Sequence, residues 1–437
     1  MANELETRTI KTAFWRLMPF LLLCYFFAYV DRINIGFAAL TMNRDIGLTS
    51  YVYGLGAGLF FWGYFFFEVP SNLILEKVGA RRWIARIMIT WGILSACMMF
   101  IKGETSFLIM RFFLGVAEAG FFPGIILYLT YWFPAAYRAR IIAVFMVAIP
   151  ISLGLGAPLS TGIMELNGLA GLKGWQWLFL LEGTPTILVG ILVYRILPDR
   201  PRDASWLSDE QKQALQDTID RENRVVQAQY NFTVWRIFLD PRILGLAFIY
   251  FVNTGINLGL AFFLPQIVKS IGLTNVQTGF VTAIPYIFGT AGILVWGYWS
   301  DRLKERRISL FLALTVSAVG LGGAAFLGSS FGAVAFMALA AIGIYGAKAP
   351  FWPLPSMFLT GSSAAGGIAL INSIGNLGGF AGPYIVGWAK DATNSFNGGL
   401  YALAAMSALA AILSLIIVKR NPQSQVQTAP GPAQPAR

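Results

Sequence analysis

Long apolar segments recur along the whole chain, and short polar breaks separate them. A helix needs about 20 mainly apolar residues to cross a bilayer. About twelve segments reach this length, near residues 16–39, 53–75, 83–101, 107–132, 141–164, 176–197, 243–267, 279–299, 308–328, 332–355, 366–388 and 399–418. Because the strands of a closed barrel would give only weak alternating segments, the pattern predicts an all-α polytopic membrane protein with twelve transmembrane helices.

The composition agrees with this fold class. Hydrophobic residues make up 57% of the 437 residues and charged residues only 12%, whereas soluble domains carry about 25% charged residues. The first apolar segment has no small-residue cleavage site and a second span follows at once, so we expect an uncleaved first helix. Cys24 and Cys97 both lie within spans as small apolar fillers, which predicts neither a disulfide nor a metal site.

The positive net charge of +11 has a membrane explanation. If the chain is threaded from a cytoplasmic N-terminus, most of the 32 Lys and Arg residues fall on the cytoplasmic side of the helices. This is the positive-inside rule, so we expect both termini in the cytoplasm, the lipid bilayer as surroundings and no nucleic-acid partner.

One long polar stretch, from about Leu197 to Arg242, divides the spans six against six. It predicts an N-terminal six-helix bundle at 1–197, a cytoplasmic linker at 198–242 and a C-terminal six-helix bundle at 243–420.

Two smaller features lie outside the predicted bundles. Ser208 stands before Asp209 and Glu210 and predicts the N-cap of a short surface helix within the linker. The tail at 421–437, rich in Pro, Gln and Ala, is expected to be disordered.

The two halves repeat a charged loop. The second span ends in "SNLILEKVGARR" and the eighth in "GYWSDRLKERR", each with an acid, a base and then a basic pair. The same order at matching places in two six-helix halves indicates an internal repeat.

At these loops the chain resembles the major facilitator superfamily, whose mark is G-x-x-x-D-R-x-G-R-R between helices two and three. The later loop keeps Gly297, Asp301 and Arg302, whereas the earlier loop has Ser71 for the glycine and Glu76 for the acid. The resemblance covers the chain from about residue 14 to residue 419 and implies two six-helix halves that alternate access to a central site.

Three further motifs narrow the resemblance. "FAYVDRINIG" in the first span, "FEVPSNLILEKVGARRW" in the second and "GWQWLFLLEG" in the sixth look like the anion:cation symporter family. That family includes bacterial carriers for tartrate, phthalate, hydroxyphenylacetate and sugar acids.

Charged residues inside the spans are the candidate functional groups, because a charge at mid-bilayer costs about 3 to more than 10 kcal/mol unless it is paired or wetted. The chain places four acids and three bases there: Asp31, Glu68, Glu118, Glu182, Arg32, Arg111 and Lys348.

Asp31 and Arg32 are consecutive, so they lie about 100° apart on a helix and are expected to face different parts of one polar cavity. The alternative is that each pairs with a neighbouring helix as packing glue. Arg111 and Glu118 stand seven residues apart and share a helix face. A carboxylate such as Glu118 in an apolar cavity can exchange protons near neutral pH.

The resemblance assigns roles to these four residues. It implies that Asp31 and Glu118 carry protons, that Arg32 anchors the carboxylate of the substrate, and that Arg111 tunes Glu118 and gates the outer side. The alternative for Arg111 is a purely structural salt bridge to Glu118. The guanidinium of Arg32 suits its role because it offers a planar fork to a carboxylate.

Other residues are candidate contacts to a bound anion. Tyr29 and Tyr64 could donate hydroxyl hydrogen bonds, although tyrosines in membrane helices are more often packing residues. Asn376 is the favoured contact in the second half, with Asn253 and Asn257 as lesser candidates and interhelical hydrogen bonding as the alternative for all three. Lys348 either reaches the cavity as a cation opposite Arg32 or lies at a mouth of the protein.

The remaining charged groups are interpreted as structural or gating groups. Glu68 is expected to belong to a conformational latch with Arg138 or Arg140 as partner. Asp301 and Arg302, in the repeated loop, are expected to act in gating. Glu182 is expected to serve helix packing.

These features predict a secondary transporter that couples protons to the uptake of a small organic anion, first a hydroxylated carboxylate such as tartrate or a sugar acid and next an aromatic carboxylate. The alternative is an anion exchanger without proton coupling, which would favour opposed arginines on helices one and seven, yet helix seven has none. An enzyme or a sensor is not favoured, since the chain has no histidine, no metal-spaced cluster and no appended signalling domain. We expect no cofactor beyond the coupling protons, a monomer, and the bacterial inner membrane as location.

Overall fold

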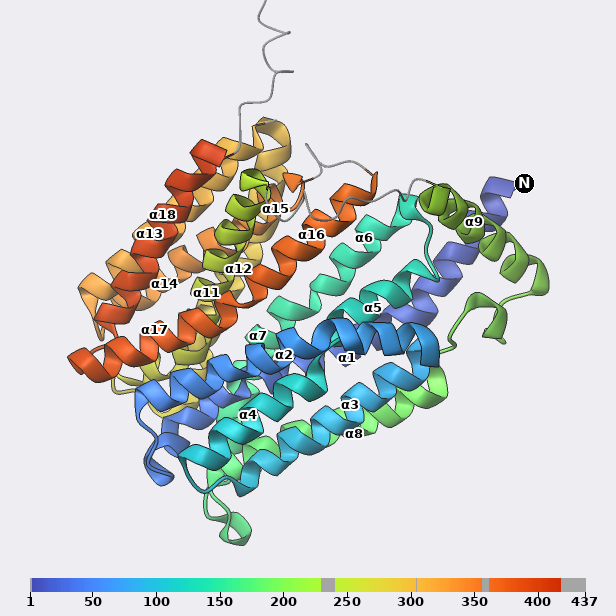
Figure 1. Ribbon diagram of the computed structural model, residues 1–437. Coiled ribbons are helices and arrows are strands. Elements are labelled where there is room, and N and C mark those ends of the chain that lie inside the picture. Colours follow the sequence, from blue (N-terminus) through green and yellow to red (C-terminus); the bar gives the residue numbers. More distant parts are fainter. Residues whose placement is uncertain (1, 229–239, 304, 356–360, 418–437) are drawn as a thin grey trace, which may run out of the picture.

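The computed structural model describes residues 2–228, 240–303, 305–355 and 361–417, and these residues are almost entirely helical (Figure 1). The predicted tail at 421–437 and part of the predicted linker, residues 229–239, lie outside the described residues.

Two helical bundles make up the described chain (Figure 1). The helices of the N-terminal half are α1 (Ala2–Asp45), α2 (Ser50–Val78), α3 (Ala80–Cys97), α4 (Glu104–Glu118), α5 (Phe121–Thr130), α6 (Ala135–Met146), α7 (Ala148–Met164) and α8 (Gly174–Ile196). Those of the C-terminal half are α11 (Pro241–Lys269), α12 (Asn275–Leu303), α13 (Arg306–Leu327), α14 (Phe331–Gly346), α15 (Lys348–Phe351), α16 (Gly361–Asn376), α17 (Gly378–Thr393) and α18 (Asn397–Ile417).

The predicted all-α membrane fold is confirmed. Eleven helices of the described chain are long and apolar enough to cross a membrane. The remaining predicted span, near 366–388, is occupied by α16 and α17, which follow one another across Leu377 and are each too short to qualify alone.

Four of the spans are interrupted, three of them near their middle and one, between α14 and α15, towards its end. The breaks separate α4 from α5, α6 from α7, α14 from α15, and α16 from α17. At the first break, Gly120 adopts φ +88°, a left-handed conformation that favours glycine, and a Cβ there would collide with the Ser71 hydroxyl. The segment pattern of the sequence does not reveal these breaks, because apolar residues continue across them.

The linker contains the expected surface helix, α9 (Asp209–Ala228). The Ser208 hydroxyl accepts a hydrogen bond from the backbone N–H of Gln211 at 3.3 Å, and the Gln211 side chain accepts from the Ser208 N–H at 3.1 Å. The N-cap prediction for Ser208 is therefore confirmed.

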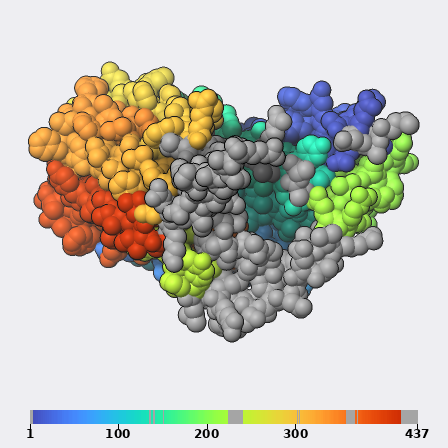
Figure 2. Space-filling model, turned by 90° about the horizontal axis from the view of Figure 1, so that it is seen from above, coloured from blue at the N-terminus to red at the C-terminus, as the bar shows by residue number. Residues whose placement is uncertain are grey.

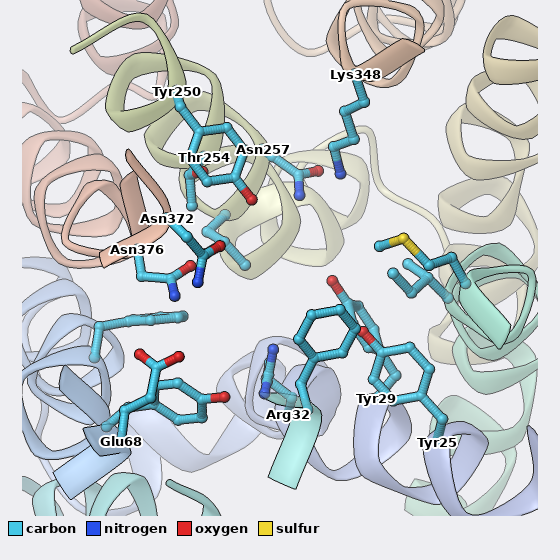
Figure 3. Close-up of a pocket in the computed structure, with 16 residues that line it drawn as sticks. Tyr25, Tyr29, Arg32, Glu68, Tyr250, Thr254, Asn257, Lys348, Asn372 and Asn376 are labelled. Carbon is cyan, nitrogen blue, oxygen red and sulfur yellow. The ribbon is translucent and has the colours of Figure 1, made fainter. Parts of the chain in front are cut away.

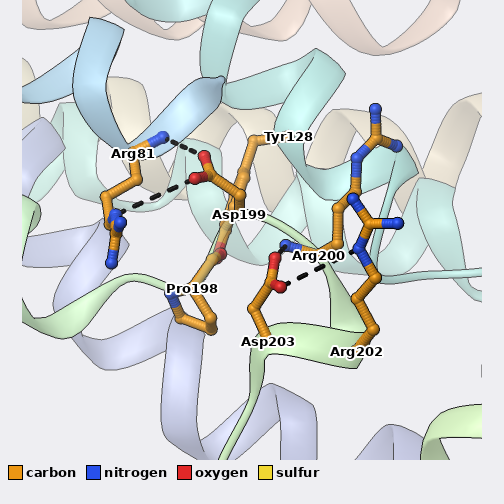
Figure 4. A network of polar contacts seen from close by, with 7 residues as sticks. All are labelled: Arg81, Tyr128, Pro198, Asp199, Arg200, Arg202 and Asp203. Atoms are coloured by element: carbon orange, nitrogen blue, oxygen red, sulfur yellow. Dashed lines mark hydrogen bonds and ion pairs between the residues drawn. The ribbon is translucent and has the colours of Figure 1, made fainter. Parts of the chain in front are cut away.

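A polar network joins the start of α3 to the chain that follows α8 (Figure 4). The Asp199 carboxylate accepts from the backbone N–H of Arg81 at 2.8 Å and lies 3.8 Å from its guanidinium. The Tyr128 hydroxyl, from α5, donates to the carbonyl of Pro198 at 2.8 Å. Part of the basic loop after α2 is thus fixed within the N-terminal half.

The two halves are in close contact at the end where α2 begins. The Asp391 carboxylate, from α17, accepts hydrogen bonds from the backbone N–H groups of Ser50 and Tyr51 at 3.1 and 2.6 Å, so it caps α2 from the other half. The Tyr53 hydroxyl donates to the carbonyl of Phe262 on α11 at 2.9 Å. Glycines allow the backbones to approach, since a Cβ at Gly54 would collide with the carbonyl of Pro383.

The bundles diverge at the opposite end, where α1 begins and α9 lies (Figure 1). Viewed from that end, the two halves lie on opposite sides of the molecule (Figure 2). The protein is therefore closed at one end and separated at the other.

Loss of the Asp391 cap should favour opening of the closed end. Asp391→Ala removes an acceptor for two N–H groups in the first turn of α2, a contact worth about 1 kcal/mol, which should raise the population with that end open about fivefold. Spin labels at positions 102 and 329, in a variant without Cys24 and Cys97, would report the change as a longer interspin distance measured by pulsed electron paramagnetic resonance. Glu165→Ala, an exposed acid at the end of α7, is the control and should leave the distance distribution unchanged. An unchanged distribution in Asp391→Ala would contradict the capping role.

Candidate functional site

A polar cavity lies between the two halves and has an empty volume of about 780 Å³, including space open to solvent. Figure 3 shows side chains from both bundles turned towards it. Its lining comprises Tyr25, Tyr29, Arg32, Phe61, Tyr64, Glu68, Phe122, Met146, Ile149, Tyr250, Thr254, Asn257, Leu258, Lys348, Asn372 and Asn376. The structure thus brings Arg32, Tyr29, Tyr64, Asn376 and Lys348, the five predicted contacts to the anion, around one cavity.

An ion pair between Arg32 of α1 and Glu118 of α4 is the electrostatic centre of the N-terminal wall. Glu118 is fully buried, and its Oε2 has no hydrogen-bond partner among the described residues. The guanidinium carbon of Arg32 lies 5.4 Å from the ring centroid of Tyr29 and 5.8 Å from that of Tyr64. Aromatic faces and one carboxylate therefore hold the Arg32 fork in the cavity.

The position of Glu118 follows from the break in its span. It is the last residue of α4, and the left-handed Gly120 directs the chain into α5.

Arg111 does not pair with Glu118. Its guanidinium donates to the carbonyls of Gly56 and Ala57 on α2, at 3.3 and 3.4 Å, and its carbon lies 5.1 Å from the Phe60 ring centroid. The structural salt bridge left open from the sequence is therefore wrong, since Glu118 has Arg32 as its partner. A gating role for Arg111 stays a prediction.

Asp31 does not face the cavity, so the expectation that Asp31 and Arg32 share one polar cavity is wrong. Its carboxylate accepts from Ser95 of α3 at 3.1 Å and from Thr186 of α8 at 2.7 Å, with the Asn34 amide at 3.5 Å. The 100° between consecutive residues turns Asp31 away from Arg32 and towards a neighbouring pair of helices.

Glu182 lies one helical turn before Thr186 on α8 and is buried. One carboxylate oxygen accepts from the Ser160 hydroxyl of α7 at 2.7 Å, and the other has no partner among the described residues. A contact between α7 and α8 agrees with the expected packing role.

The C-terminal wall of the cavity carries a cation and several amides (Figure 3). Lys348 begins α15 directly after the break that follows α14, and its Nζ lies 4.7 Å from the Tyr345 ring centroid. Within the described part of the chain, no carboxylate lies within ion-pair distance of Lys348. Lys348 lines the cavity, so the first of the two predicted positions for it is the one observed.

Of the asparagines, Asn376 and Asn257 line the cavity together with Asn372. Asn253 instead donates to the carbonyl of Ile344 at 3.1 Å, which is the interhelical alternative.

Glu68 does not pair with Arg138, one of the two partners predicted for the latch. Arg138 pairs with Glu222 of α9 at 3.5 Å, and the side chain of Arg140, the other predicted partner, lies outside the described residues. Glu68 itself faces the cavity one helical turn beyond Tyr64.

The repeated loop of the second half is described only in part. The side chain of Asp301 lies outside the described residues. Arg302 is exposed, and its guanidinium carbon lies 4.7 Å from the Tyr298 ring centroid. Their gating role stays a prediction.

Several lining residues were not identified from the sequence, among them Tyr25, Tyr250 and Thr254. Tyr25 stands one turn before Tyr29, and its ring lies edge-on to that of Tyr29 at 5.6 Å. The helical spacing from Tyr29 could have indicated Tyr25. Thr254 and Tyr250 stand three and seven residues before the candidate Asn257 on α11, so the same kind of spacing could have indicated them.

No group of three or more Cys, Asp or Glu side chains among the described residues could hold a metal ion. The site therefore consists of one paired and one unpaired cation, amides, hydroxyls and aromatic rings around a space between two bundles. Two helical bundles around a central polar cavity define a membrane transporter of small solutes.

Comparisons with known proteins agree with this class. The model of the Major Facilitator Superfamily matches residues 21–383 and 246–437, and the chain belongs to that family. It is 49% identical over 424 residues to a protein of Agrobacterium vitis named "Putative tartrate transporter", with 97% of this chain and 94% of the relative covered. It is 41% identical to a "Quinolone resistance transporter" of Acinetobacter baumannii, covering 97% of this chain and 98% of the relative.

Solved structures share the fold. A bacterial homologue of the human lysosomal transporter Spinster, in an inward-facing and occupied conformation, superposes with a TM-score of 0.75 at 16% identity. The match covers 92% of this chain and 96% of the other.

The cluster around Asp31 should depend on an acceptor rather than on a charge for its stability. Asp31→Leu leaves the donors of Ser95, Thr186 and Asn34 without their partner and should lower the free energy of unfolding by about 2 kcal/mol. Asp31→Asn keeps an acceptor, and the hydroxyls can rotate to meet its amide, so its loss should be much smaller. Thermal unfolding in detergent compares the two variants. An equal loss in both would show that the charge itself holds the cluster.

Proposed function

We propose that the protein is a secondary active transporter that couples protons to the uptake of a small hydroxylated organic anion, such as tartrate or a sugar acid, by alternating access. The observation that carries the proposal is the pair of cations on opposite walls of one cavity, Arg32 in the first half and Lys348 in the second.

The lining favours an anion with polar groups along its length. Arg32 offers a bidentate fork for one carboxylate, and Lys348 offers a point charge for a second. From the C-terminal half, Asn257, Asn372 and Asn376 present amides that bind hydroxyl groups. The resemblance to two relatives named for tartrate supports this order of substrates.

Aromatic rings also line the cavity, chiefly from Tyr25, Tyr29, Tyr64 and Phe122. A flat ring could stack on them, so an aromatic carboxylate such as phthalate or hydroxyphenylacetate is the second class of substrate.

Proton coupling follows from competition for Arg32. In the empty cavity Glu118 occupies the guanidinium, so an incoming carboxylate must displace it. Protonation of Glu118 discharges the ion pair and frees the fork, whereas loss of the proton restores the pair and expels the anion. Asp31 is proposed as the second proton site on the strength of the family resemblance alone.

The arrangement of the halves supports an inward-facing state. The end that carries the start of α1 is the separated one, and the positive-inside pattern assigns that end to the cytoplasm. The proposal therefore includes cytoplasmic termini, the bacterial inner membrane and a single chain as the working unit.

The test is uptake into proteoliposomes of tartrate, sugar acids, phthalate and hydroxyphenylacetate, with and without an inward proton gradient. Uptake of one acid that collapses with a protonophore supports symport. Exchange that does not depend on the proton gradient supports the anion exchanger instead. If none of these acids is taken up, the result contradicts an organic-anion carrier.

Variants of the proton-coupling residues should lose a different activity from variants of the substrate anchor Arg32. Glu118→Gln and Asp31→Asn should lose accumulation driven by the pH gradient and retain exchange, because neither removes the guanidinium. Arg32→Ala should lose binding altogether. Tartrate exchange and gradient-driven uptake, measured side by side in proteoliposomes, distinguish these results. Equal loss of binding in all three variants would contradict the division of roles.

Lys348 should favour substrates with two carboxylates over substrates with one. Threonate is tartrate with one carboxylate replaced by a hydroxymethyl group, so it lacks the partner proposed for Lys348. Lys348→Met should weaken tartrate binding about tenfold or more and threonate binding far less. Isothermal titration calorimetry with both acids measures the difference. The same loss for both acids would show that Lys348 does not read the second carboxylate.

A further inference from the structure

Glu68 is a buried acid in the cavity for which the proposed mechanism has no use. Its side chain is only 8% exposed, and its Oε2 has no hydrogen-bond partner among the described residues. Its backbone carbonyl accepts from the Asn72 side-chain amide at 2.9 Å, whereas its carboxylate forms no ion pair among the described residues. Figure 3 shows the carboxylate turned into the cavity, with Asn376 near it.

The charges around Glu68 do not compensate it. No ion pair to Glu68 forms within the described residues. Arg32 is the cation whose charge acts on it, and the Arg32 guanidinium is already engaged by Glu118. An ionised carboxylate in such surroundings carries a large desolvation cost that one proton removes.

The other titratable groups on the Glu68 side of the cavity are tyrosines, which carry no positive charge. Tyr64 lies one turn away on the same helix, and Tyr250 faces it from α11. Tyr29 lines the cavity from α1, and from α15 only Lys348 adds a cation, on the opposite wall. The neighbouring residues from α16 are the uncharged Asn372 and Asn376.

The net charge of four side chains limits which anions the cavity can bind. Arg32 and Lys348 balance Glu118 and Glu68 when all four groups are ionised. A dianion added to that cavity would leave it with uncompensated negative charge in a medium that screens poorly. Protonation of Glu118 alone removes only part of that excess.

We propose that Glu68 is a further proton-binding group, which must take up a proton before a dicarboxylate binds and then donates a hydrogen bond to it. The inference rests on the proposed function. Glu118 and Glu68 together then neutralise one charge for each carboxylate that enters the cavity, whereas Asp31 lies outside the cavity.

The two acids differ in how they act. Glu118 competes directly with the substrate for the Arg32 fork, whereas Glu68 repels the substrate across open space. Removal of the Glu68 charge should therefore make binding easier at high pH rather than abolish it, an effect that loss of a structural contact would not produce.

The experiment measures protons taken up when tartrate binds to the purified full-length chain, by calorimetry in buffers of different ionisation enthalpy. In the wild type, affinity should rise as pH falls, with a net uptake of protons that includes one on Glu118 and one on Glu68. Glu68→Gln should take up about one proton fewer and should bind tartrate more tightly than the wild type at pH 8.5. Glu68→Asp keeps the carboxylate and should keep the uptake of the wild type.

Glu165→Gln, which removes an exposed acid outside the cavity, is the matched control and should behave as the wild type. Unchanged proton uptake in Glu68→Gln, or weaker binding at pH 8.5 together with a native elution profile, overturns the inference. If the wild type binds no tartrate, threonate or phthalate at any pH, the proposed function fails instead. The two failures are therefore distinguishable.

Discussion

The ion pair between Arg32 and Glu118 is the interaction on which the rest of the cavity depends. A lone guanidinium in the middle of a span would cost several kcal/mol or more, and Glu118 together with flanking aromatic rings removes much of that cost. The same pair is poor as a permanent structural bond, because one oxygen of Glu118 has no partner among the described residues. The pair therefore stabilises the buried guanidinium of Arg32 but does not satisfy both oxygens of Glu118, so another carboxylate can replace Glu118 on Arg32.

Helix breaks bring such groups to the cavity in both halves. Glu118 ends α4, Lys348 begins α15 and Asn376 ends α16, so three of the polar residues around the site stand at a break. A residue beside a break has backbone groups without a helical partner, which favours polar surroundings. The two halves, which repeat a charged loop in the sequence, therefore also both carry polar residues at helix breaks within their spans.

The sequence predicted the all-α membrane fold and the five cavity residues Arg32, Tyr29, Tyr64, Asn376 and Lys348, but not most of the lining. Spanning length and the cost of buried charge depend only on local sequence, so Arg32 and Lys348 could be selected without knowledge of their neighbours. The partners could not be predicted. Helical spacing turned Asp31 away from Arg32, but only the packing of α3 and α8 gives Asp31 the hydroxyls of Ser95 and Thr186. Arg111 shares a helix face with Glu118 and still donates to α2, because a neighbouring backbone lies closer.

The contact between α2 and α17 combines glycines, which let the two backbones approach, with aromatic side chains such as Tyr51 and Tyr384. A Cβ at Gly54 would collide with Pro383, and a Cβ at Gly387 would collide with Ser50. Glycine has no side-chain rotamers to lose, and an aromatic ring loses fewer than a long flexible side chain, so each closure of this contact costs little side-chain entropy. The glycines of α2 and α17 therefore lower the cost of joining the two halves at the end where α2 begins.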